Sequence, residues 1–145
     1  MKIRKAKKTD YKKVIELYAD FVNQPDRYKN SGDDSFLKAI KTPCFYIYLA
    51  EIKNKVVGFI TFSKRIVIRY PNPIIEVEEF YVIPELRRQG IGKKLMQKAL
   101  NFAQKNNCKY VFLASSKDRV SAHKFYKALG FDEYAFHYRR ALSCS

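Results

Sequence analysis

Residues 77–107 read VEEFYVIPELRRQGIGKKLMQKALNFAQKNN and decide the fold. The first residues of this stretch are mostly β-branched or aromatic, which is typical of a buried strand, and Pro84 ends that strand. Apolar residues then recur at helical spacing, at Leu95, Met96, Ala99, Leu100 and Ala103. The stretch therefore predicts a strand, a basic glycine loop and a helix, in that order.

The loop RRQGIG at residues 87–92 predicts an anion site. The first turn of a helix carries backbone N–H groups without partners and partial positive charge. Gly90 and Gly92 leave the main chain accessible, and full charges lie nearby on Arg87, Arg88, Lys93 and Lys94. We interpret the loop as a phosphate cradle. The alternative is a plain strand-to-helix connection with solvated lysines.

The composition indicates one globular domain. The chain has 145 residues, of which 47% are hydrophobic.

No apolar run approaches the roughly 18 residues that span a bilayer, and we expect a cytoplasmic protein without membrane insertion. Cys44, Cys108 and Cys144 form no C-x-x-C pair, so we expect reduced thiols, the first two in the core, and no metal site.

The net charge of +15 favours an anionic partner, and nucleic acid, an acidic membrane or a phosphorylated small molecule would all fit. Because lysines are spread along the whole chain, the charge alone selects none of these.

The rest of the chain predicts further elements around the central stretch. Expected strands cover residues 2–5, 45–52, 56–68, 110–114 and 132–142. Expected helices begin at Thr9 or Asp10, at Asp33 or Asp34, and at Val120, the last of them ending before Gly130. We expect the irregular residues 24–32 to form a lid or a substrate wall.

Two motifs on these elements resemble the GNAT superfamily of acyl-CoA-dependent N-acyltransferases. The first is Val82 followed by Arg-x-x-Gly-x-Gly at residues 87–92, and the second is Ala-x-x-Phe-Tyr-x-x-x-Gly-Phe at residues 122–131. The resemblance implies a single N-acetyltransferase domain over residues 1–145. It also implies a mixed α/β fold, with a bent sheet of six or seven strands flanked by about four helices.

The resemblance further implies that acetyl-CoA is the cosubstrate and lies where the sheet splays beside the central strand. Its pyrophosphate would bind the loop amides, and its pantetheine arm would pair with the strand. The implied contacts are Phe80, Tyr81, Val82, Arg87, Arg88, Gln89, Gly90, Ile91, Gly92, Lys93 and Arg119. Arg119 stands where many members carry asparagine, so it could instead reach a phosphate of CoA or an anion of the substrate.

Acyl transfer to an amine requires a base, an oxyanion site and a proton for the leaving thiolate. Glu76, Glu78 and Glu79 are the candidate bases in an otherwise apolar strand; from the motif we favour Glu78, acting through water, with Glu79 second. Strict alternation would put Glu78 and Glu79 on opposite faces, but family members often carry a bulge here. The resemblance makes Tyr126 the general acid and the N–H of Val82 the oxyanion donor. We interpret His123 as structural or exposed.

From the resemblance we expect a small-molecule amine as the acceptor, although the sequence does not fix it. Residues 119–126 and the His-Tyr-Arg-Arg run at 137–140 resemble the aminoalkylphosphonate N-acetyltransferase branch, which suits a phosphonate- or phosphate-bearing amine. A peptide amine is the alternative acceptor. A basic nucleic-acid-binding module is a further alternative, disfavoured because the tyrosines follow buried-type patterns. The sequence leaves open whether the chain forms a homodimer.

Overall fold

The computed structural model describes residues 1–24, 26 and 35–143. The chain divides into two compact units, Met1–Leu113 and Ala114–Ser145, and each is described by itself. The predicted lid at residues 24–32 lies almost entirely outside the described residues.

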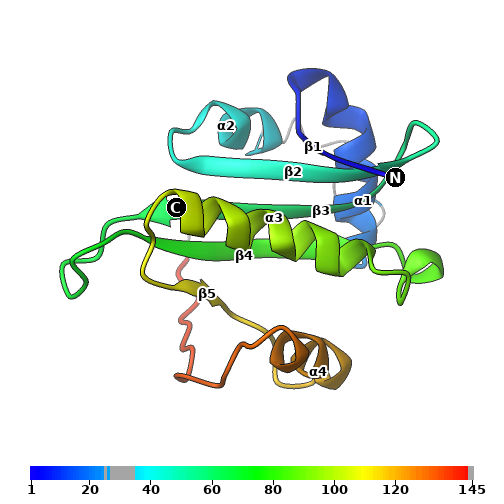
Figure 1. The fold of residues 1–145 in the computed structure, drawn as a ribbon. Helices are drawn as coiled ribbons and strands as arrows, with labels where there is room; N and C mark the ends of the chain where they lie inside the picture. Colours follow the sequence, from blue (N-terminus) through cyan, green and yellow to red (C-terminus); the bar gives the residue numbers. More distant parts are fainter. Residues whose placement is uncertain (25, 27–34, 144–145) are drawn as a thin grey trace. The chain divides into compact units, whose positions relative to one another are not determined.

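The first unit is built on a five-stranded sheet with strand order β1-β2-β3-β4-β5 (Figure 1). Its strands are β1 (Lys2–Lys5), β2 (Phe45–Ile52), β3 (Lys55–Arg65), β4 (Ile74–Val82) and β5 (Val111–Leu113). All neighbours pair antiparallel except β4 and β5, which are parallel. Its helices are α1 (Tyr11–Phe21), α2 (Ser35–Lys41) and α3 (Ile91–Lys105), with single 3-10 turns at Lys8–Asp10 and Pro84–Leu86.

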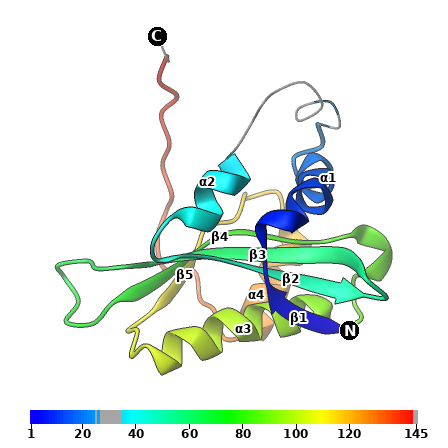
Figure 2. The same cartoon turned by 90° about the horizontal axis from the view of Figure 1, so that it is seen from above.

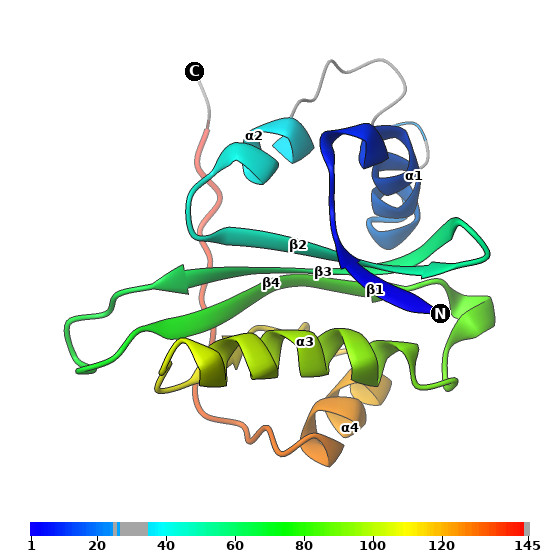
Figure 3. The same ribbon diagram turned by 45° about the horizontal axis from the view of Figure 1, so that its top comes forward.

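Helices cover both faces of this sheet. Figure 3 shows α1 and α2 over one face and α3 over the other. The first face is closed by an apolar cluster that includes Val14, Leu17, Phe36 and Phe59. On the second face, α3 buries four of the five residues of the predicted stripe, while Leu100 is only half-buried. The ring of Phe102 lies 5.3 Å from that of Phe62. This two-sided burial explains the nearly continuous apolar sequence of β3.

Two connections of the first unit lie far apart on its sheet. The turn between β3 and β4 and the start of α3 lie at opposite ends of the sheet (Figure 2). From the end of β4 at Val82 the chain passes through the 3-10 turn Pro84–Leu86 and the glycine loop to the start of α3 at Ile91, in the predicted order of strand, loop and helix. The described part of the second unit, up to residue 143, contains one helix, α4 (Val120–Ala128), close to its predicted bounds.

The expected strand count of six or seven is wrong, because the described residues form five strands. The predicted strand at residues 132–142 has no regular structure. Its aromatic residues alternate as in a strand, yet Tyr134, Phe136 and Tyr138 are 64%, 78% and 86% exposed. Alternation favours an extended backbone, but a strand also needs a partner for its N–H and C=O groups, and none of the described strands pairs with this segment.

Two smaller expectations are also wrong. The third predicted strand ends at Arg65 and not at residue 68, and Ile66 and Ile68 are exposed. Cys44 is an exposed thiol with φ of 60° and not a core residue, whereas Cys108 is half-buried. Among the described residues, no helix combines the length and apolar character that a bilayer crossing requires.

Candidate functional site

A β-bulge interrupts β4 at Glu78. In the pairing with β3, Thr61 lies opposite Glu79 while the next residue, Phe62, lies opposite Val77, so Glu78 is an extra residue without a partner. A bulge shifts the side-chain alternation by one residue. The strict alternation that would put Glu78 and Glu79 on opposite faces of the sheet therefore does not hold at this point.

The bulge places the three glutamates of β4 on one face of the sheet. Thr61, Ser63 and Arg65 alternate along β3 and so share a face. Each contacts one glutamate: Thr61 Oγ1 donates to Glu79 Oε2, Ser63 Oγ donates to Glu78 Oε1 at 2.8 Å, and Arg65 donates to Glu76 Oε2 at 3.0 Å. The face is that of α1, because Tyr18 Oη also donates to Glu79 Oε2, at 2.9 Å.

Within the first unit, the edge of β4 beyond Val77 has no described strand beside it, and it is called the open edge. Pairing with β5 ends at Val77 and Leu113, and no described strand pairs with that edge further along. The amide of Ile75 points toward this side, donating to Tyr110 O at 2.9 Å, whereas the amide of Ile83 points toward β3 and donates to Val57 O at 3.0 Å.

The direction of the next amides follows from these two hydrogen bonds. Successive residues of a strand point their N–H groups to alternate sides, so Ile75 and Ile83 would point the same way without the bulge. Because Ile83 faces β3, the N–H groups of Phe80 and Val82 face the open edge. The bulge therefore turns two amides toward the opening as well as turning the glutamates to one face.

The start of α3 presents a second set of amides. Gly90 is the N-cap, with φ of 78° and no side-chain cap, and the first intrahelical bond runs from Lys94 N to Gly90 O. In the described part of the chain, the amides of residues 88–93 donate to no protein acceptor. A side-chain carbon added at Gly90 would meet open space. The turn is an accessible group of donors flanked by the exposed Arg88 and Lys93.

Arg87 turns back toward β4. Its Nε donates to Val82 O at 2.8 Å, and its guanidinium carbon lies 5.5 Å from the ring centre of Tyr81. Burial, with the nearby charge of Asp20, raises the pKa of the Tyr81 phenol, although Arg87 opposes this. Arg87 thus links the loop to the end of β4, where the predicted contact residues are Phe80, Tyr81 and Val82.

Tyr126 and Arg119 lie in the second unit. Arg119 is the exposed N-cap residue of α4. The ring of Tyr126 packs 5.6 Å from that of Phe125 and 6.1 Å from that of Phe131. Burial raises the pKa of the Tyr126 phenol, so this group keeps its proton at neutral pH. His123 Nε2 forms a hydrogen bond of 2.8 Å with Ser116 O, which agrees with a structural role.

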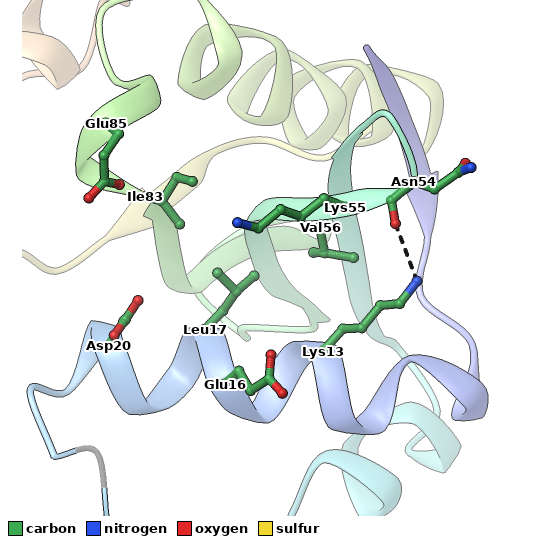
Figure 4. Close-up of a pocket in the computed structure, with 9 residues that line it drawn as sticks. All are labelled: Lys13, Glu16, Leu17, Asp20, Asn54, Lys55, Val56, Ile83 and Glu85. Atoms are coloured by element: carbon green, nitrogen blue, oxygen red, sulfur yellow. Dashed lines mark hydrogen bonds between the residues drawn. The ribbon is translucent and has the colours of Figure 1, made fainter.

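A cleft of about 530 Å³ lies beside α1 (Figure 4) and contains none of the predicted site residues. Its lining mixes charges with an apolar floor: Lys13, Glu16, Leu17, Asp20, Asn54, Lys55, Val56, Ile83 and Glu85. Sequence reasoning missed this cleft, because it joins a helix face to a hairpin turn far away in the chain.

Sequence reasoning also missed Tyr18, Thr61 and Ser63, the hydroxyl partners of the glutamates. The available signal was the pair of polar residues at alternate positions of an otherwise apolar strand, at residues 61 and 63. Nothing in the sequence pointed to Tyr18, which occupies an ordinary position in the helical pattern of α1.

Comparison with known proteins identifies the family of the chain. The sequence profile of the acetyltransferase (GNAT) family matches residues 8–131. An uncharacterized N-acetyltransferase of Archaeoglobus fulgidus is 30% identical over 131 residues, which are 87% of this chain and 89% of the relative. The aminoalkylphosphonate N-acetyltransferase of Salmonella typhimurium is 27% identical over 140 residues, which are 97% of this chain and 90% of the relative.

A solved structure agrees with these relatives. An aminoglycoside acetyltransferase from an uncultured soil metagenomic sample, in complex with trehalose, superposes with a TM-score of 0.83 and 25% identity. The match covers 98% of this chain and 96% of that one. The open edge of β4 and the free amides at the start of α3 thus occur in a chain that belongs to the acetyltransferase (GNAT) family of N-acetyltransferases.

Proposed function

We propose that the chain transfers an acetyl group from acetyl-CoA to the primary amine of a small molecule, and that phosphonate- or phosphate-bearing amines are the first candidates. The observation that carries the proposal is a pair of donor sets on neighbouring parts of the chain. The amides of Phe80 and Val82 at the unpaired edge of β4 are followed, after one 3-10 turn, by the uncapped amides at residues 88–93. A ligand with an extended amide arm and a diphosphate would match both.

The residues present fit acetyl-CoA. Free amides and the partial charge of the helix start favour a diphosphate, and Gly90 leaves room for it to approach. The further contacts assigned to this cosubstrate are Tyr81, Arg87, Arg88, Gln89, Ile91, Gly92, Lys93 and, from the second unit, Arg119. Acetyl-CoA supplies a thioester whose carbonyl carbon accepts the amine.

The remaining roles follow from the chemistry of the step. An alkylamine with a lysine-like pKa costs roughly 4.6 kcal/mol to deprotonate at pH 7, so a base is the main requirement. Glu78 and Glu79 are the candidates, acting through water on the α1 face. The Val82 N–H would stabilise the oxyanion. Tyr126, whose raised pKa keeps it protonated, would return a proton to the sulfur.

The similarity to the Salmonella aminoalkylphosphonate enzyme supports a phosphonate-bearing acceptor, as does the net charge of +15. A polycationic amine is the second candidate. Three carboxylates on one face would favour such a substrate, and the soil aminoglycoside acetyltransferase has a similar structure. Glu76 is already ion-paired with Arg65, which leaves two carboxylates for substrate and makes this the weaker candidate.

The test is an acceptor panel in which CoA release is measured with a thiol reagent. The panel contains aminoethylphosphonate, glucosamine 6-phosphate, an aminoglycoside, spermidine and a lysine-containing peptide. We expect the highest kcat/KM with an amine that carries a phosphonate or phosphate. A higher kcat/KM for the aminoglycoside or spermidine would select the second candidate. Transfer only to the peptide would refute both.

A further inference from the structure

The carboxylate of Glu79 is held from two separate elements. Tyr18 on α1 and Thr61 on β3 both donate a hydroxyl hydrogen to the same oxygen, Oε2. In the described part of the chain, no hydrogen bond reaches the other oxygen, Oε1. Glu79 therefore has one oxygen fixed by the protein and one available to a ligand or a water molecule.

The hydroxyl of Thr61 can point its hydrogen in only one useful direction. The backbone N–H of Glu79 donates to Thr61 Oγ1 at 3.1 Å. Because an N–H group only donates and a hydroxyl has a single hydrogen, that hydrogen must go to the carboxylate. Thr61 is fully buried, so water does not compete for it.

The ring of Tyr18 is fixed by its neighbours. It stacks on Phe59 with ring centres 4.4 Å apart and planes 8° from parallel. Phe21 packs edge-on against both rings, at 6.3 Å from Tyr18 and 5.8 Å from Phe59. The phenol hydroxyl thus reaches Glu79 from a side chain with little rotational freedom.

The other two glutamates of β4 are held differently. Glu78 is exposed and accepts a single hydroxyl, from Ser63. Glu76 is committed to the guanidinium of Arg65. Glu79 is half-buried and is the one whose single oxygen takes two fixed donors. A base that acts through water needs such a defined position. Its oxygen must lie within hydrogen-bonding distance of the water before its pKa can affect the rate of proton transfer.

We propose, on the basis of the function proposed above, that Tyr18 and Thr61 are positioning residues that make Glu79 the proton acceptor of the reaction. By fixing Oε2 they aim Oε1 at a water molecule beside the incoming amine. Through this water, Oε1 first takes the proton that the ammonium nitrogen must lose before it can attack. As the C–N bond forms and the C–S bond breaks, the nitrogen releases a second proton to water, and the departing sulfur takes one from the phenol of Tyr126.

The experiment is a double-mutant cycle on the recombinant chain with the best acceptor of the panel. Tyr18→Phe keeps the stacked ring and removes only the hydroxyl, and Thr61→Val keeps the shape of the side chain. We expect each to lower kcat about tenfold, with KM for the amine and affinity for acetyl-CoA changed less than twofold. Thr61→Ser, which restores a hydroxyl, should recover most of the rate.

The decisive comparison is in the Glu79→Gln background. If both hydroxyls act through the carboxylate, Tyr18→Phe and Thr61→Val should cause no further loss of kcat there. Tyr48→Phe is the matched control: it removes a phenol hydroxyl near Phe62 on the α3 face and should leave kcat unchanged.

Two results would overturn the inference alone. One is an unchanged kcat in Tyr18→Phe and Thr61→Val, and the other is an equal loss with and without Glu79. Failure of the wild-type chain to acetylate any amine of the panel would instead overturn the proposed function, and the inference with it.

Discussion

Replacing Gly90 by alanine should separate backbone strain from cofactor binding. Gly90 has φ of 78°, a conformation that costs an L-residue about 1–2 kcal/mol. Since nothing lies within 4 Å of the added carbon, no clash contributes to the loss of stability. At about 2–4 °C per kcal/mol for a chain of this size, the melting temperature should fall by roughly 2–8 °C.

The chain offers a matched control in Gly130. Its φ is 89° and an added carbon there also meets open space, so Gly130→Ala should cause a similar loss of stability. Only Gly90 lies among the free amides at the start of α3. A side chain there would hold a diphosphate away from the N–H groups, and charge-assisted hydrogen bonds are worth about 1.5–3 kcal/mol each. We therefore expect Gly90→Ala to weaken binding of acetyl-CoA at least tenfold.

The assay is isothermal titration calorimetry with acetyl-CoA, combined with thermal unfolding of the unliganded variants. Wild type and Gly130→Ala should bind with similar affinity despite their different melting temperatures. Equal affinities for Gly90→Ala and Gly130→Ala would refute the assignment of the diphosphate to this turn.

Three further changes test other parts of the chain. Asp10 is buried and accepts hydrogen bonds from Arg4 that hold the pKa of its carboxyl below the usual value, so its contribution to stability is present above about pH 4 and lost as the pH falls through the lowered pKa. Asp10→Asn should therefore lower the melting temperature at pH 7 and flatten its decline below pH 4; parallel acid profiles would contradict this. Gly58→Ala would place a carbon 2.7 Å from the main-chain oxygen of Tyr81, and it should cost about 1–3 kcal/mol in a denaturant titration and weaken acetyl-CoA binding at the neighbouring strand edge. A variant as stable as wild type would show that β4 shifts freely. Tyr126→Phe should lower kcat while leaving the affinity for acetyl-CoA nearly unchanged, and an equal kcat would remove Tyr126 from the reaction.

Local patterns were sufficient for most of the first unit. The expected strands at residues 2–5 and 45–52 coincide with β1 and β2, because β-branched and aromatic runs there are bounded by polar turn residues. The stripe of α3 was readable because apolar residues at helical spacing must pack against something. The position of the glycine loop could be predicted too, because clear patterns indicate the strand before it and the helix after it.

Features that depend on distant partners were not readable. The partner of Glu79 on α1 is Tyr18, far away along the chain, and no local pattern marks it. The strand expected at residues 132–142 failed for the same reason: alternation describes one chain, whereas pairing depends on a second. The bulge was expected only because members of the family often carry one at this position. The residues VEEF contain no glycine or proline that would indicate it.

The bulge also reconciles the strongly basic chain with a reaction that needs both an anion site and carboxylates. Arg88 and Lys93 stand at the start of α3, next to free amides, where a diphosphate would be stabilised. On β4, the strand before α3, the bulge at Glu78 places the carboxylates on the α1 face. There they accept hydrogen bonds from hydroxyl groups and from one arginine. Under the proposed function, the net positive charge of the chain would attract a phosphorylated cosubstrate, while the local negative charge at β4 would favour an amine. In the same strand without the bulge, strict alternation would put Glu78 and Glu79 on opposite faces and would turn the Val82 amide toward β3. The shared carboxylate face and the amide at the unpaired edge therefore depend on the same irregularity.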